Sequence, residues 1–278
     1  MALTDQPFGL VPDAARPRPC DRVDPSNLAD YVTREMPCVV VGGARGWPAS
    51  WTRASLDQRI GELEIRCKLS RSHVHPDFRV ATVKEMFATE ATTFRALFAS
   101  FAGDEPARRL FTGDEQFLLR VRDGVTTVHE PLRTLLDDLV IPEVARAQLY
   151  TIWAWFSGRG VHTGLHYDNN GCHNLNAQLA GRKRCVLFPP SDLDRMGLFP
   201  IDGANPAVNC SALEELPDGG FEATLEHGDL LFIPAWWLHA FWHLGEFNAN
   251  VNFWWKPEQP SDNLVVRRQQ EIDGRGRA

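Results

Sequence analysis

The chain has 278 residues, of which 44% are hydrophobic, so it can bury a large core as one domain or as two tightly joined parts. A formal net charge of −7 argues against nucleic acid as the main partner, and no apolar run approaches the roughly 18 residues of a membrane span. The beginning of the chain lacks the basic-then-apolar order of a signal peptide, and the six cysteines form no CxxC pair. We therefore expect a cytoplasmic protein with reduced thiols and no membrane partner.

Residues 1–115 are predicted to form a mixed α/β region packed on the core of the protein. The first 25 residues are proline-rich and aperiodic, which is typical of a surface arm. The elements expected after the arm are a short helix capped by Ser26, a buried strand at 37–43, a helix near Leu56–Ile60, a strand near Glu64–Leu69, a helix start with capping-box spacing at Thr82 and Glu85, and a helix presenting Phe94, Leu97, Phe98 and Phe101.

Residues 116–256 are predicted to form a β-rich core, followed by a tail at 257–278. Many short apolar strands separated by turn residues are typical of a sandwich or barrel. The elements expected are a strand and turn at 117–124, a helix at 131–142, a strand at 149–160, two strands joined by a glycine-containing turn at 172–190, a loop with a short helix at 192–206, three or four short strands with turns over 221–256, and a polar helix around Leu264–Ile272.

A candidate metal site begins with His166 and Asp168. On an extended strand, residues i and i+2 point to the same face, so this imidazole and carboxylate could hold one ion together. His239 on a later strand is the candidate third ligand. Two histidines and one carboxylate leave three positions of an octahedron open, as in non-haem Fe(II) oxygenases. An HxD tripeptide is common by chance, so a satisfied core histidine is the competing interpretation of His166.

Lys183 strengthens the interpretation as a metal site. If its neighbours Arg182 and Arg184 face solvent, Lys183 faces inward, and a buried ammonium is costly unless it is paired. An inward Lys183 therefore implies an anionic ligand, to which Thr163 could also donate its hydroxyl. An iron with three open positions beside a cationic group suits a 2-oxo acid with a second carboxylate, with one position left for O2.

Two predicted strands carry three amides each on one face. Solvent-facing strands would explain the pattern, and so would amides that line a buried pocket. We favour the inward orientation because the alternate residues are small and apolar, and because both strands are close in sequence to the candidate ligands. The amides are Asn174, Asn176 and Gln178 on one strand and Asn248, Asn250 and Asn252 on the other.

Together these motifs resemble the cupin-type JmjC-domain oxygenases that depend on Fe(II) and 2-oxoglutarate. The resemblance covers roughly Tyr31 to Lys256, and the chain is especially similar to the asparaginyl hydroxylase known as factor inhibiting HIF and its bacterial relatives. The resemblance implies a double-stranded β-helix core (cupin or jelly-roll, JmjC-like), so the expected fold is mainly β with a mixed α/β N-terminal region and a short C-terminal helix. The motifs are PCVVVGGARGWPASW, T-x-x-HYD, N-x-x-AQ-x-x-G-x-KRC-x-LFPP, GD-x-L-x-IP-x-x-W-x-H and VNFW.

The resemblance also implies roles for individual residues. The implied iron ligands are His166, Asp168 and His239. The implied contacts of 2-oxoglutarate are Thr163 and Lys183 at its C5 carboxylate, Asn174 and Asn252 near its other end, and Trp155 in its lining. Ligand roles are not expected for His162, His173 and His243, nor for the HVHPD segment at 73–77.

Three departures from the family pattern stand out. The loop at Asn169–His173 carries two extra residues, and no tyrosine occurs near Phe117–Val121, where a close relative has one that reaches the C5 carboxylate. The tail is shorter than the family's dimerisation segment, so a monomer and a homodimer both stay open.

The sequence therefore predicts an Fe(II)- and 2-oxoglutarate-dependent dioxygenase. Its expected reaction is hydroxylation of a C–H bond in a protein or peptide side chain or in an amino-acid-like metabolite, with release of succinate and CO2. The alternatives are an N-demethylase or a tRNA-modifying hydroxylase of the same superfamily, a metal-dependent cupin of another class such as an isomerase, and a non-catalytic binding protein.

Overall fold

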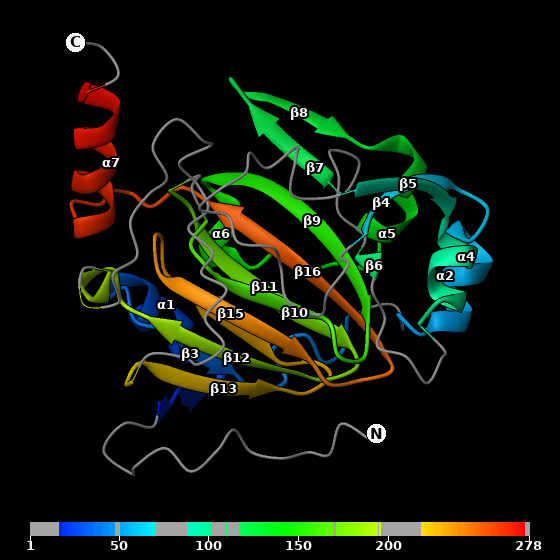
Figure 1. Ribbon diagram of the computed structural model, residues 1–278, viewed down its shortest axis with the longest axis horizontal. Helices are drawn as coiled ribbons and strands as arrows, with labels where there is room; N and C mark the ends of the chain where they lie inside the picture. The colour runs from blue at the N-terminus through cyan, green and yellow to red at the C-terminus, as the bar shows by residue number, and fades with distance from the viewer. Residues whose placement is uncertain are drawn as a thin grey trace.

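The computed structural model of the chain describes residues 17–47, 51–69, 88–101, 109–110, 117–168, 171–193, 195 and 218–275. Two large sheets face each other and form a mainly β fold, as expected (Figure 1). The five-stranded sheet has the order β1 (Arg18–Pro19), β13 (Phe221–Leu225), β12 (Lys183–Phe188), β15 (Leu238–His243) and β10 (His162–His166). The eight-stranded sheet has the order β2 (Asp21–Val23), β3 (Cys38–Val40), β14 (Leu230–Ile233), β11 (His173–Ala180), β16 (Phe247–Trp255), β9 (Leu149–Gly158), β7 (Phe117–Arg122) and β8 (Val125–Val128).

A third, smaller sheet and several short helices surround this core. The small sheet has the order β5 (Ala88–Thr93), β4 (Glu64–Leu69) and β6 (Arg109–Leu110). The helices are α1 (Leu28–Thr33), α2 (Arg53–Ile60), α4 (Phe94–Ala99), α5 (Arg133–Leu136), α6 (Glu143–Arg146) and α7 (Leu264–Arg275), with 3-10 turns at Pro25–Asn27, Glu130–Leu132 and Pro190–Asp192. Figure 1 shows α7 on the opposite side of the molecule from α2 and α4.

The outer face of the eight-stranded sheet holds the main hydrophobic core. Apolar side chains alternate with amides along β11 and β16, so Leu175 and Phe253 point outward, where they belong to the same buried cluster as Leu56 of α2 and Phe98 of α4. Burial of this face removes a large apolar area from water and fixes the strand register. The amides are thereby turned toward the facing sheet.

The five-stranded sheet is covered on its outer face by the C-terminal part of the chain. Val186 and Phe188 of β12 cluster there with Val265 of α7. On its inner face, Cys185 and Leu187 pack with Leu231 of β14, which belongs to the eight-stranded sheet. Apolar contacts at this end thus hold the two sheets together, and polar side chains fill the rest of the interior.

The turn between β11 and β12 connects the two sheets and requires a glycine. Gly181 has a φ of 73°, and a Cβ atom there would lie 2.3 Å from the backbone oxygen of Phe247. The side chain of Asn248 closes the turn, since its oxygen accepts from the backbone N–H of Arg182 at 3.0 Å. This turn places Lys183 at the start of β12, facing inward.

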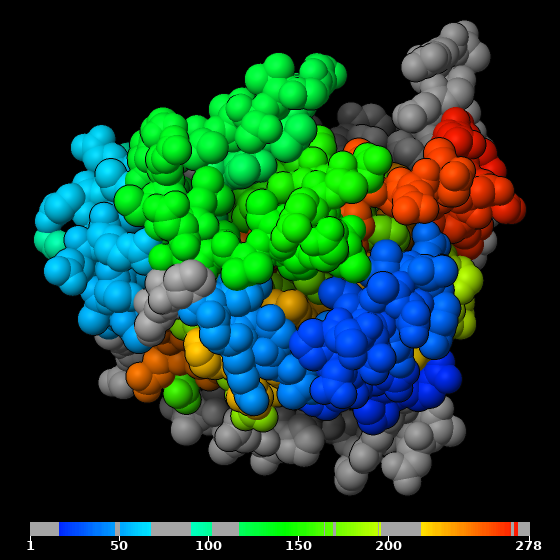
Figure 2. Space-filling view, turned by 180° about the vertical axis from the view of Figure 1, so that it is seen from behind, coloured from blue at the N-terminus to red at the C-terminus, as the bar shows by residue number. Residues whose placement is uncertain are grey.

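The N-terminal part of the chain differs in several details from the prediction. The expected surface arm contains β1 and β2, which join the two large sheets through parallel pairing with β13 and β3. The helix expected after Ser26 is present, but Asn27 holds its N-cap position and makes no side-chain capping bond. Figure 2 shows this segment in blue beside the green residues that come after β6, and α1 contacts α6 there.

Other predicted elements are shorter or longer than expected. The helix predicted at 131–142 is limited to the 3-10 turn at Glu130–Leu132 and α5, and α7 extends the predicted C-terminal helix to Arg275. The capping box at Thr82 and Glu85, the HVHPD segment and most of the helix predicted at 192–206 lie outside the described residues. The division into 1–115, 116–256 and 257–278 stays a prediction.

Candidate metal centre

Strands β10 and β15 bring His166 and His239 together. The two residues are direct partners in the antiparallel pairing, and their ring centroids are 4.2 Å apart. Both side chains therefore rise from neighbouring strands of the five-stranded sheet and point into the space between the sheets.

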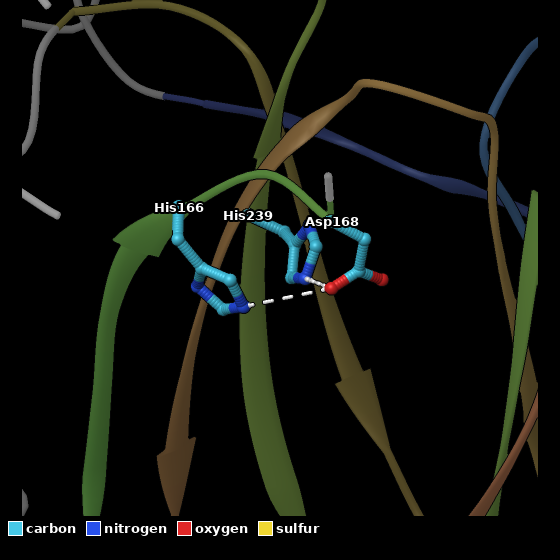
Figure 3. Close-up of side chains that lie close together, drawn as sticks. All are labelled: His166, Asp168 and His239. Carbon is cyan, nitrogen blue, oxygen red and sulfur yellow. Dashed lines mark ion pairs between the residues drawn. The ribbon is translucent and has the colours of Figure 1, made fainter. Parts of the chain in front are cut away.

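Asp168 completes the cluster from the segment after β10. The strand ends at His166, so Asp168 lies just beyond it, and the chain there curves so that the carboxylate faces the two rings (Figure 3). The Asp168 Oδ1 atom lies 4.0 Å from His166 Nε2 and 3.9 Å from His239 Nε2. These separations exceed hydrogen-bonding distance, and one ion could reach all three atoms.

The second oxygen of Asp168 is fixed by two donors of the eight-stranded sheet. Trp254 Nε1 donates to Oδ2 at 2.9 Å, and Asn174 Nδ2 donates to it at 3.1 Å. Burial alone would raise the pKa of Asp168, but His239, His166 and these two donors outweigh it and lower that pKa. The carboxylate is thus held ionised, with Oδ1 turned toward the histidines.

His239 is held as a neutral imidazole with a defined tautomer. Its Nδ1–H donates to the backbone oxygen of Trp237 at 3.0 Å, which leaves the lone pair of Nε2 facing Asp168. Burial and the neighbouring His166 lower the pKa of His239 to about 4. Neutral imidazole is the form that binds metal ions, and a carbonyl partner on the other nitrogen is typical of a metal-binding histidine.

The donor set fits a divalent metal ion of the iron type. Two imidazole nitrogens and one carboxylate oxygen lie within 4.8 Å of one another, and this is the one such group of histidine, cysteine and acidic side chains in the described part of the chain. Two histidines with one carboxylate and open positions form the facial arrangement of non-haem Fe(II) sites. The structure therefore brings the three predicted residues into one group. That they bind a metal ion is a proposal.

Lys183 is the one buried ammonium of the interior among the described residues. Its side chain is 1% exposed, as the inward orientation required, and no described carboxylate forms an ion pair with it. Its Nζ donates to Asn176 Oδ1 at 2.5 Å and lies 4.6 Å from the centroid of the Phe241 ring. Burial lowers the pKa of Lys183 to about 7.

A chain of hydrogen-bonded amides links Lys183 to the metal site formed by His166, Asp168 and His239. All six amides predicted to face inward are buried. Four hydrogen bonds run in one direction, each residue donating to the next: Lys183 to Asn176 at 2.5 Å, Asn176 to Asn252 at 3.1 Å, Asn252 to Asn174 at 2.9 Å and Asn174 to Asp168 at 3.1 Å. The network therefore starts at a cation and ends at an anion, so its bond dipoles reinforce one another.

Thr163 reaches the inner face through an irregularity in β10. Residues three apart in a regular strand point to opposite faces, but the register shifts between Thr163 and His166, so both are opposite inward residues of β15. Thr163 is the cross-strand partner of Phe241, whose ring also contacts the Lys183 ammonium. Thr163 thus belongs to the neighbourhood of Lys183.

Trp155 is linked to the metal site through two other tryptophans. It is on β9 opposite Asn250 and stacks on Trp153, with ring centroids 6.1 Å apart. Trp153 in turn makes an edge contact with Trp254 at 6.0 Å, the tryptophan bonded to Asp168. An aromatic wall therefore extends from the metal cluster along β9.

The other histidines near the site make contacts outside the metal site. His173 Nδ1 accepts from the backbone N–H of Ala235 at 3.0 Å, and His243 Nδ1 lies 2.7 Å from Ser157 Oγ. His162 stacks on Trp242 at 4.6 Å. None of the three belongs to the metal cluster.

Two residues of the site were missed by sequence reasoning in their present roles. Sequence reasoning assigned no role at the site to Trp254, and Asn176 was only one of six amides. The signals were the VNFWW segment beside the amide strand and the central place of Asn176 in the Asn-x-Asn-x-Gln pattern. Neither signal names a partner, because the partners Asp168 and Lys183 come from other strands.

Fold and site together define a cupin-type protein: a double-stranded β-helix with a His-Asp-His cluster between its two sheets. The chain belongs to the family described as Cupin-like domain, which it matches over residues 25–261, and it is of the JmjC type. This confirms the family predicted from the motifs.

Several proteins resemble the chain over most of its length. It is 27% identical to tRNA wybutosine-synthesizing protein 5 of Gallus gallus over 82% of this chain and 73% of that protein, and 28% identical to the Homo sapiens protein over 75% and 67%. It is 24% identical to the lysine-specific demethylase JMJ30 of Arabidopsis thaliana, over 85% of this chain and 53% of the demethylase. These names support an enzymatic role in the superfamily.

Within the described residues, no helix has the length and apolar character needed to cross a membrane.

Proposed function

We propose that the protein is an Fe(II)- and 2-oxoglutarate-dependent dioxygenase that hydroxylates a C–H bond of its substrate. His166, Asp168 and His239 would hold the iron, and Lys183 and Thr163 would bind the distal carboxylate of 2-oxoglutarate. Asn174, Asn252 and Trp155 would line the rest of the cosubstrate site. We further propose a cytoplasmic location.

The observation that carries this proposal is the buried Lys183. A metal site of two histidines and one carboxylate would by itself be compatible with many cupins, including isomerases and binding proteins. An ammonium kept between the sheets with an amide and an aromatic ring as partners has no counter-charge among the described carboxylates, so it can pair with an anion. A 2-oxo acid with a second carboxylate can reach both the cluster and this cation.

The residues of the chain would bind and orient the reactants. Bound Fe(II) would supply the redox chemistry by which O2 and 2-oxoglutarate yield succinate, CO2 and a hydroxylated substrate. Trp254 and Asn174 keep Asp168 Oδ1 directed at the cluster, and the carbonyl of Trp237 keeps His239 in its binding tautomer. The burial of Lys183 keeps bulk water from the cation and strengthens its attraction for an anion.

Anaerobic titration tests the proposal without a known substrate. Adding Fe(II) and then 2-oxoglutarate should produce a visible charge-transfer band, and admitting air should produce succinate. Both signals should disappear in His166→Ala and Asp168→Ala. Metal binding without the band would favour a cupin of another class, and absence of metal binding would favour a non-catalytic binding protein.

The substrate class has two candidates. We favour a protein or peptide side chain or an amino-acid-like metabolite, because the net charge of −7 opposes an extended nucleic-acid contact. A tRNA nucleoside is the second candidate, supported by the names of the wybutosine-synthesizing relatives, and N-demethylation is supported by the name of the demethylase. A screen of peptides, metabolites and tRNA, read as the gain of one oxygen atom or the loss of a methyl group, separates them.

A further inference from the structure

Asn176 is the direct partner of Lys183, although the family resemblance implies no role for it. The side chain comes from β11 in the eight-stranded sheet and reaches Lys183 of β12 in the facing sheet. It is 2% exposed and both of its polar atoms are engaged: the oxygen accepts from Lys183, and the nitrogen donates to Asn252 Oδ1. Its orientation is therefore fixed from two sides.

This arrangement fixes where the ammonium can place an anion. A lysine ammonium has three donors on a flexible stem, so its position must be set by its partners. One N–H of Lys183 is taken by Asn176 at 2.5 Å, and the Phe241 ring lies 4.6 Å away on another side. The Asn176 amide and the Phe241 ring thereby limit the directions in which the remaining donors can point.

The chemistry of an amide matters as much as its position. An asparagine oxygen holds the ammonium without neutralising it, so the positive charge stays available to a ligand. An aspartate of the same shape would form a buried ion pair with Lys183 and would repel a second carboxylate. The residue type at position 176 thus decides whether the Lys183 charge is neutralised within the protein or is available to bind a ligand.

We propose that Asn176 is a positioning and specificity residue, which holds Lys183 so that the site selects 2-oxo dicarboxylic acids over 2-oxo monocarboxylic acids. This inference rests on the proposed function, since it assumes that the oxo end of the acid lies at the metal cluster. Asn176 acts through Lys183 and not on the reacting atoms.

Two isosteric substitutions test the inference: Asn176→Asp and its matched control Asn250→Asp. Both asparagines are buried, and both donate to the same Asn252 oxygen, at 3.1 Å and 2.8 Å. Each substitution replaces that donor with a carboxylate on the inner face of the sheet. They differ in their relation to Lys183, because only Asn176 donates to Asn252 and also accepts from Lys183.

The measurement is the affinity of the Mn(II)-loaded protein for 2-oxoglutarate and for pyruvate, by calorimetry and without turnover. Pyruvate has the same metal-binding end and lacks the distal carboxylate. In Asn176→Asp, the preference for 2-oxoglutarate over pyruvate should fall by about tenfold or more, since a charge-assisted contact is lost. In Asn250→Asp the preference should stay within about twofold of wild type, a change too small to signal a lost contact.

An unchanged preference in Asn176→Asp, or an equal fall in both variants, would overturn the inference. If Asn176→Asp does not fold, Asn176→Ser replaces it: the shorter side chain cannot reach Lys183, so the preference should again fall while pyruvate affinity holds. Wild-type protein that binds neither acid would refute the proposed function itself. A wild-type preference that survives the Asn176 substitutions refutes only the role of Asn176.

Discussion

The two facing sheets contribute different chemistry to the same interior. The five-stranded sheet carries His239 and Lys183, and His166 ends one of its strands. The eight-stranded sheet contributes neutral donors and acceptors, among them the Asn176 amide and the Trp254 indole. Asp168 lies between them, with one oxygen toward the histidines and the other toward the second sheet.

The difference shows how a buried polar site can be fixed without added charge. Each buried charge is costly, and a second set of charges to orient the first would multiply that cost. Amides and an indole orient the charged groups through hydrogen bonds at little electrostatic cost. We therefore expect substitutions on the five-stranded sheet to remove binding, and substitutions on the eight-stranded sheet to weaken it by degrees.

The largest effect is expected from loss of a ligand in His166→Ala or His239→Ala. Either variant should bind Mn(II) more than about 100-fold more weakly, beyond the roughly 10–100-fold that outer partners contribute. Calorimetry on the metal-free protein measures this directly. His227→Ala is the control, because the His227 ring contacts the Leu179 carbonyl at 2.7 Å and lies outside the cluster. Unimpaired binding in the ligand variants would remove the cluster from the proposed role.

Lys183→Met should weaken the binding of 2-oxoglutarate and at the same time raise the stability of the metal-free protein. Loss of a charged hydrogen-bond donor is worth about 1.5–3 kcal/mol, so 2-oxoglutarate affinity should fall by about 10–100-fold. The metal-free protein should become more stable by about 1–3 kcal/mol in urea unfolding, because a buried charge is replaced by an apolar chain of similar length. Arg182 has an exposed side chain that pairs with Glu226, so the control Arg182→Met should change neither the 2-oxoglutarate affinity nor the stability much. A less stable Lys183→Met protein would contradict this account of the interior.

The sequence predicted which residues gather at the site better than it predicted how they are held there. His166, Asp168 and His239 were identified from residue type, spacing and family motifs, and the inward Lys183 from its arginine neighbours. The register shift after Thr163, the turn that returns Asp168 and the pairing of β1 with β13 were not predicted. Each depends on contacts between strands distant in sequence, which local periodicity does not specify. For the same reason the amides could be placed inside, but the partner of Asn176 could not.

Trp254→Phe should produce a smaller, graded effect from the eight-stranded sheet. It removes the 2.9 Å bond to Asp168 Oδ2 and keeps most of the aromatic packing, while Asn174 still donates to the same oxygen. Mn(II) affinity should fall by about tenfold, the lower end expected for an outer partner of a ligand. The matched control is Trp255→Phe on the opposite face of β16, where Trp255 stacks on Phe232 at 5.9 Å. Equal losses in the two variants would indicate general loosening of the strand.

The effect that joins the two sheets is the pH dependence set by Lys183. Its pKa is about 7 in the folded protein against an ordinary value of 10.5, so between these values the unfolded chain binds more protons than the folded one. Stability of the metal-free protein should therefore rise with pH across this window, by up to about 1.4 kcal/mol per unit. Affinity for 2-oxoglutarate should change in the opposite direction, since the dicarboxylate requires the protonated ammonium, and it should weaken by up to about tenfold per unit above pH 7.

Urea unfolding and calorimetry at matched pH values measure the two slopes. Both slopes should flatten in Lys183→Met, and slopes of the same sign in the wild-type protein would show that another group controls the interior.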